Sequence, residues 1–226
     1  MPKRRLEAFS DGVIAILITI MVLELHTPAG TSWHALGHEL PVLLAYVLSF
    51  VYLGIYWNNH HHMLAAVSRV SGAVLWANLH LLFWLSLVPF TTAWMSEHRF
   101  PATPTAVYGI VLLAAAIAYL ILQTTLLRAE GEHSGLRVAL GSDAKGKVSA
   151  LLYCLGIGLA FADRWIGLAV YVAVALIWLV PDRRVERHLT RAPASEQAER
   201  VNDPAAQPVQ REPSVGERPT REPFPS

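Results

Sequence analysis

The stretch RRLEAFSDGVIAILITIMVLEL, residues 4–25, decides the fold class. It carries no charged residue from Gly12 to Leu23, and a helix needs roughly 20 mostly apolar residues to cross the hydrocarbon of a bilayer. Its first half also contains Asp11, and a carboxylate carried to the bilayer centre costs about 2.5–3.5 kcal/mol. We therefore predict a transmembrane helix whose carboxylate has a partner on another helix.

The composition of the whole chain agrees with a membrane protein. Of its 226 residues, 54% are hydrophobic and only 15% are charged. The formal net charge of +1 gives no overall basic field, so we expect no nucleic-acid partner. The single cysteine, Cys154, excludes an intramolecular disulfide and a cysteine-based zinc site. A secretory signal peptide fits the N-terminus poorly, because Glu7 and Asp11 are acidic and further hydrophobic segments follow.

Six segments have the length and apolarity of a transmembrane helix. They are residues 6–25, 39–59, 73–94, 105–127, 147–163 and 165–181. Only Asp163 and Arg164 separate the last two, which favours a tight helical hairpin, with one long interfacial element as the alternative. We predict an all-α, multi-pass membrane protein with six transmembrane helices.

The distribution of Lys and Arg predicts the orientation of these helices. If the N-terminus is cytoplasmic, all Lys and Arg except Arg99 and Arg164 fall on the cytoplasmic side, so both termini are expected there. From Asp182 onward the chain is rich in proline and charged residues and poor in large apolar ones. We predict a transmembrane domain over residues 1–181 and a polar, disordered cytoplasmic tail over residues 182–226.

The first helix has two different faces. At about 100° per residue, one face spans about 100° and carries an aliphatic stripe with one hydroxyl: Gly12, Ile16, Thr19, Ile20 and Leu23. Such a stripe is typical of a face turned to lipid or to the protein core. Asp11 lies about 140° away from Ile16. Arg5 is about 120° around the axis from Asp11 and roughly 9 Å along it, so we expect partners for Asp11 on other helices rather than an intrahelical ion pair.

Candidate partners occur on the second and third predicted helices. The segment WNNHHH, residues 57–62, lies at the end of the second, and Asn78 lies near the start of the third, both on the predicted cytoplasmic side. We predict a buried network that satisfies its polar groups internally. It comprises Arg5, Ser10, Asp11, a histidine and Asn78.

These residues carry a resemblance to a known family. Arg5, Phe9, Ser10 and Asp11 form the motif Arg-x-x-x-Phe-Ser-Asp, which a helix ending in VLEL follows. Trp57-x-x-His60-His61 on the second helix, and Asn78 through LVPF on the third, accompany the motif. With these features, residues 5–181 resemble a bacterial member of the lysosomal and endosomal potassium channel family, the transmembrane protein 175 type.

The resemblance implies a homotetramer in a bacterial plasma membrane, with the first helix of each chain lining a central pore. It implies a constriction at Ile16, further apolar rings at Ile20 and Leu23, and a hydroxyl ring at Thr19. The sequence lacks the Thr-Val-Gly-Tyr-Gly filter, so we expect an apolar neck that gates by dewetting and selects potassium modestly. Potassium is then a permeant ion in a lipid-embedded protein, and no cofactor is expected.

The polar residues have structural roles in this interpretation. Asp11 would hold the pore helix at a fixed rotation, together with Arg5, Phe9, Ser10, His60 or His61, and Asn78. Glu24, near the outer end of the helix, forms either a ring of four carboxylates that concentrates cations or an ordinary interfacial carboxylate.

The same residues also suggest a metal site, a transporter or a membrane enzyme. Consecutive histidines point about 100° apart on a helix, so residues 60–62 cannot present three ligands to one metal ion. A secondary transporter tends to show paired repeats with broken helices, which we do not find. A membrane enzyme or a transporter that uses Asp11, His60 and Asn78 is the alternative function, and we expect a channel without enzymatic activity.

Overall fold

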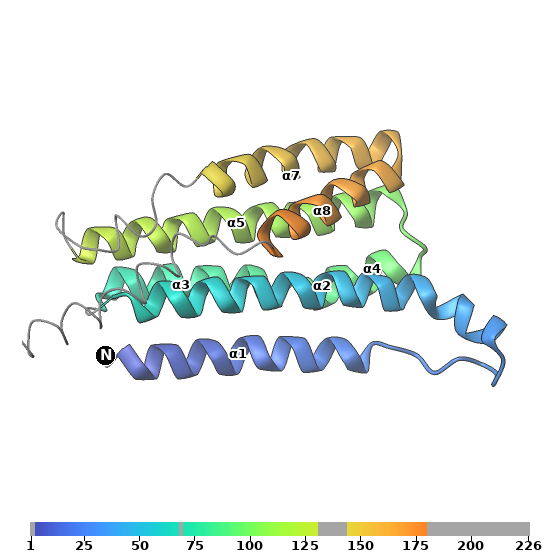
Figure 1. Cartoon of the computed structure of the whole chain (residues 1–226), viewed down its shortest axis with the longest axis horizontal. Helices are drawn as coiled ribbons and strands as arrows, with labels where there is room; N and C mark the ends of the chain where they lie inside the picture. The colour runs from blue at the N-terminus through green and yellow to red at the C-terminus, as the bar shows by residue number, and fades with distance from the viewer. Residues whose placement is uncertain (1–2, 68–69, 131–143, 180–226) are drawn as a thin grey trace, which may run out of the picture. The chain divides into compact units, whose positions relative to one another are not determined.

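The computed structural model describes residues 3–67, 70–130 and 144–179, and the regular structure in these ranges is entirely helical (Figure 1). The helices are α1 (Lys3–Leu23), α2 (Trp33–Ala65), α3 (Gly72–Ser86), α4 (Val88–Glu97), α5 (Ala102–Glu130), α7 (Ala144–Ala162) and α8 (Arg164–Leu179). The predicted all-α class is confirmed. The predicted tail, residues 182–226, and the last two residues of the predicted span 165–181 lie outside the described residues.

Five described helical segments are long and apolar enough to cross a membrane, with α3 and α4 together forming one of them. The sixth predicted span corresponds to α8, which has 16 described residues. At 1.5 Å per residue α8 is about 24 Å long, shorter than the roughly 30 Å of a hydrocarbon core. The chain is therefore a multi-pass membrane protein, and the described part of α8 is shorter than a full span.

Helix α2 extends well beyond the predicted range 39–59 at both ends. At its start, the Ser32 hydroxyl accepts a hydrogen bond from Ala35 N at 3.2 Å and caps the helix. At its end, the helix continues through residues 57–62 to Ala65. Hydropathy ends the span at Asn59, but the next residue, His60, has its partner Asn78 within the bundle, and the helix continues.

The third predicted span, residues 73–94, is broken at Leu87, between α3 and α4. Pro89 occupies the first turn of α4, where its missing N–H removes the helical hydrogen bond to the carbonyl of Leu85. The Leu87 N–H instead donates to Trp84 O at 3.2 Å, which tightens the turn. A proline inside a long apolar segment therefore explains the break.

The last two helices fold back on each other as the predicted hairpin. The carboxylate of Asp163, the one residue between them, accepts a hydrogen bond from Trp165 N at 2.8 Å at the start of α8. A Cβ added at Gly167 would lie only 2.9 Å from the Cα of Ala160, so glycine allows the two backbones to approach. At the other end of the pair, Trp178 Nε1 donates to Ser149 Oγ at 2.8 Å.

Helix α1 packs against α2, α3 and α4, whereas α5, α7 and α8 pack mainly with one another and with α3, α4 and α2. Figure 1 shows α1 running alongside α2 at one edge of this helical unit. Because α1 has neighbours on one side only, one of its faces is buried and the other is left uncovered within a single chain.

Candidate functional site

The buried face of α1 is a narrow stripe that repeats every three or four residues. It consists of Leu6, Ser10, Ile14, Leu17 and Met21. All five side chains are nearly or fully inaccessible, and the four apolar ones belong to the main hydrophobic core. This spacing is the period of one helix face, so it fixes which side of α1 turns toward α2, α3 and α4.

The predicted aliphatic stripe lies on the opposite, uncovered face. Ile16 is 57% exposed and Leu23 is 79% exposed, and Ile20 and Thr19 are exposed as well. A Cβ placed at Gly12 would meet nothing within 4 Å. Within one chain the stripe is therefore not part of the core, although its side chains are as apolar as core residues.

The hydroxyl of Thr19 is the polar group of this face. It donates a hydrogen bond to Ile16 O at 2.9 Å in its own helix. The lone pairs of a hydroxyl oxygen remain available when its hydrogen is donated, so Thr19 presents acceptor capacity on the uncovered face.

Beneath the opposite face, Ser10, His60 and Asn78 form a hydrogen-bonded group from three helices, which we call the buried trio. Asn78 Nδ2 donates to Ser10 Oγ at 2.9 Å, and Asn78 Oδ1 lies 2.7 Å from His60 Nε2. An amide oxygen only accepts, so His60 Nε2 carries the proton and donates. Each of the three is at most 1% exposed, so the trio ties α1, α2 and α3 together inside the bundle.

Asp11 has its partner on α2. Trp57 Nε1 donates to Asp11 Oδ1 at 3.0 Å, and the ring of His61 stacks on the Trp57 indole at a centroid distance of 6.0 Å. Trp57 belongs to the segment 57–62 that contains the candidate partners, but it is not a member of the predicted network. The signal was the spacing Trp57-x-x-His60, which puts both side chains one turn apart on the side of α2 that contacts α1.

The remaining residues of the predicted network lie elsewhere. Arg5 and Phe9 are exposed and share the uncovered face with Ile16. Among the described residues, the one ion pair found is between Lys3 and Glu7, at 3.6 Å, so Arg5 forms none there. Lys3 Nζ also donates to Ala65 O at 3.0 Å. Within one chain, Lys3 and not Arg5 connects the start of α1 to the end of α2.

The three consecutive histidines point in different directions, as helical geometry requires. His60 is buried against Asn78, His61 stacks on Trp57, and His62 is exposed. Over the ranges that the structure describes, no three His, Cys, Asp or Glu side chains gather as metal ligands.

Glu24 follows the last residue of α1 and is exposed. With Glu97, Thr92 and Ser96 it lines a shallow hollow between the ends of α1 and α4 and the neighbouring part of α2. The predicted outer acidic position therefore lies at the end of α1, on the side turned toward α2 and α4.

Comparison with known proteins identifies the family to which this geometry belongs. The family model of the endosomal/lysosomal potassium channel TMEM175 matches residues 5–89, which contain nearly all of α1 and the whole of α2 and α3. A potassium channel from Chryseobacterium sp. (strain P1-3) is 54% identical over 189 residues, covering 84% of this chain and 98% of that protein. A potassium channel from Streptomyces collinus is 37% identical, over 77% of this chain and 90% of that protein.

A solved structure agrees with the sequence relatives. The crystal structure of a lysosomal potassium-selective channel TMEM175 homolog from Chamaesiphon minutus superposes with a TM-score of 0.67 at 29% sequence identity. The match covers 79% of this chain and 96% of that one, so it includes more of the helical unit than residues 5–89 alone. The chain belongs to the TMEM175 family.

Proposed function

We propose that the chain forms a potassium channel by assembling as a homotetramer in which four α1 helices line a central pore. Relatives in its family are named as potassium channels, which favours channel function over an enzyme or a transporter. The observation that carries the proposal is the uncovered apolar stripe of α1, with Ile16 within it and the buried face centred about 120° around the helix from Ile16. Four such stripes around one axis would cover each other and enclose a narrow apolar passage.

Conduction through this passage depends on the cost of dehydrating the ion. Four Ile16 side chains offer no oxygen, so an ion passes the neck by shedding water or when the neck widens. The Thr19 hydroxyls follow about 4.5 Å further along the helix axis and offer acceptor oxygens that replace part of the lost hydration. Potassium loses water more easily than sodium, so the neck favours potassium, and the discrimination is modest because no carbonyl filter follows it.

The polar groups between α1 and its neighbouring helices position α1 and do not react with a substrate. Asp11 is held by Trp57, and the buried trio on the opposite side from the stripe is closed to solvent within the chain. A catalytic group must reach the reacting atoms of a substrate. These side chains are instead hydrogen-bonded to one another. Their role is to fix the rotation of α1, and therefore which side chains face the axis.

The experiment is potassium flux into liposomes that contain the purified protein, without any counter-substrate. We expect flux from the wild type, and we expect Ile16→Ala to raise it and lower the preference for potassium over sodium, because the neck becomes wider. Val22→Ala is the matched control, since Val22 is also exposed on α1 but lies about 120° from Ile16. No flux from the wild type would refute the channel, and equal effects of Ile16→Ala and Val22→Ala would remove Ile16 from the neck.

A further inference from the structure

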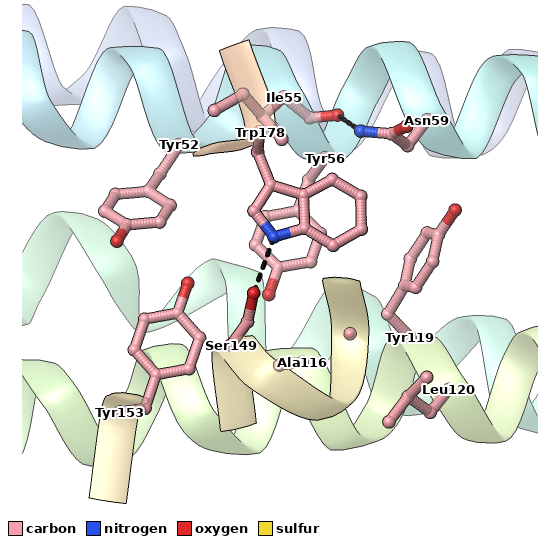
Figure 2. A pocket seen from close by; sticks show the side chains of 11 residues that line it. Tyr52, Ile55, Tyr56, Asn59, Ala116, Tyr119, Leu120, Ser149, Tyr153 and Trp178 are labelled. Atoms are coloured by element: carbon pink, nitrogen blue, oxygen red, sulfur yellow. Dashed lines mark hydrogen bonds between the residues drawn. The ribbon is translucent and has the colours of Figure 1, made fainter. Parts of the chain in front are cut away.

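The cavity between α2, α5, α7 and α8 has mainly aromatic walls and is small (Figure 2). Its volume is about 30 Å³, which is room for one or two water molecules and not for an organic ligand. Two polar groups of its wall already have partners in the chain: Tyr52 Oη donates to Tyr171 O at 2.6 Å, and Trp178 Nε1 donates to Ser149 Oγ at 2.8 Å. This cavity therefore belongs to the packing between the helices.

A pair of metal-ligating side chains lies on the surface, at the start of α2. His34 and His38 are both exposed, and their ring centroids are 4.8 Å apart. They are four residues apart in the same helix, so both side chains lie on one face. No other two histidines of the sequence are three or four residues apart. The contact between the two rings therefore distinguishes this pair from the other histidines of the chain.

The separation of the two rings suits a single zinc ion. A zinc-bound imidazole has a Zn–N distance of about 2.0–2.1 Å, so its ring centroid lies about 3.2 Å from the ion. Two imidazoles at the tetrahedral angle then have centroids about 5.2 Å apart. The centroids of His34 and His38 are 4.8 Å apart, so small rotations of two exposed side chains are enough to reach this geometry.

The helix that carries the pair is capped at its start and lacks one hydrogen bond further along. The Ser32 hydroxyl caps the first turn of α2. Pro41 has no N–H to donate to the carbonyl of Gly37, which lies between the two histidines. An ion bound to both His34 and His38 would join the two ends of this turn and hold it helical.

The surroundings of the pair accept a cation. The distribution of Lys and Arg predicts the start of α2 to lie on the outer side of the membrane, where dissolved metal ions have access to exposed side chains. The sequence has no Lys or Arg from residue 6 to residue 68, and the acidic Glu39 directly follows His38. The helix N-terminus disfavours a cation only weakly at an exposed site, because water and salt screen it.

We propose that His34 and His38 chelate one Zn²⁺ ion per chain on the outer surface of the protein. Each imidazole binds the ion through the lone pair of one ring nitrogen, and water fills the remaining positions. Imidazole suits zinc and the neighbouring late transition metals, whereas Mg²⁺ and Ca²⁺ prefer oxygen ligands and do not bind here. The site goes beyond the proposed function, because zinc binding requires neither a pore nor ion flow.

The test is isothermal titration calorimetry of the purified full-length protein, without a polyhistidine tag, with ZnCl₂ and separately with MgCl₂. We expect one Zn²⁺ per chain and no Mg²⁺. His34→Ala and His38→Ala should each weaken zinc binding about tenfold or more, because one ligand nitrogen is lost. His98→Ala is the matched control and should bind like the wild type, because His98 is exposed but has no second histidine one turn away. The double variant His38→Ala/Glu39→His keeps the number of histidines but places them about 140° apart, so it should bind as weakly as His38→Ala.

Three outcomes would overturn the proposal. They are a wild type that binds no zinc, equal zinc affinities of the wild type and His34→Ala, and a double variant that binds zinc as tightly as the wild type. Melting curves give a second measurement: zinc should raise the melting temperature of the wild type and not that of His38→Ala, since a ligand stabilises the state that binds it. Without zinc the variants should melt like the wild type, because both side chains are exposed, so a loss of binding is not a loss of folding.

Discussion

The buried trio gives the most direct prediction, through the substitution Asn78→Leu. Leucine has a similar size but neither donates nor accepts, so both hydrogen bonds to Asn78 are lost. His60 Nε2–H is 1% exposed and would have no acceptor, which costs about 1–3 kcal/mol. The Ser10 hydroxyl can instead donate to a carbonyl of its own helix. Losing the hydrogen bond between Ser10 and Asn78 therefore costs about 0.6 kcal/mol, the average for interhelical hydrogen bonds in membranes. We expect Asn78→Leu to lower the free energy of unfolding by about 1.6–3.6 kcal/mol.

The assay is reversible unfolding of the purified protein in mixed micelles, followed by far-ultraviolet circular dichroism. Asn58→Leu is the control, because Asn58 lies on α2 close to His60 but is exposed. A His60→Leu/Asn78→Leu double variant should be more stable than Asn78→Leu alone, since it leaves no orphaned imidazole. Equal free energies of unfolding for Asn78→Leu and Asn58→Leu would refute the reasoning. It would also be refuted if the losses of stability from His60→Leu and Asn78→Leu, measured singly, added up to the loss in the double variant.

Three further predictions concern the connection of α1 to α2, the hairpin and the outer end of the proposed pore. Trp57→Phe removes the donor to Asp11 and should lower the yield of assembled protein on gel filtration, whereas normal assembly with altered flux would place Asp11 in the ion path. Gly167→Ala should cost about 1–3 kcal/mol in the same unfolding assay, because its Cβ meets backbone of α7; Gly158→Ala, with open space around it, should cost nothing. Glu24→Gln should reduce potassium conductance at low ionic strength and have little effect at high salt, and equal effects at both would exclude an electrostatic role.

The sequence predicted the fold class and most of the helices because hydropathy is a local property. A run of about 20 apolar residues predicts a membrane helix whatever residues surround it. Each predicted range overlaps a described helix. The predicted ranges are wrong at the ends of some helices and at the break between α3 and α4. Helix α2 continues past Asn59 because His60 finds Asn78 inside the bundle, which hydropathy does not register.

The uncovered stripe of α1 was also visible in the sequence, because a helix period of 3.6 residues sorts side chains into faces without reference to other helices. Ile16, Thr19, Ile20 and Leu23 do share one face in the structure. Periodicity alone did not indicate whether this face meets lipid, core or pore. The structure of the chain excludes the core, and the roles of the four residues in conduction stay predictions.

Tertiary structure alone decided which polar groups meet. His60 and His61 are adjacent in the sequence but point about 100° apart, and only the rotation of α2 against α3 turns His60 to Asn78. The same rotation brings Trp57 to Asp11, while the path of α1 past the end of α2 selects Lys3 instead of Arg5. Composition and spacing indicate which polar residues are candidates for hydrogen bonds. Which of them form a pair depends on how whole helices pack against one another.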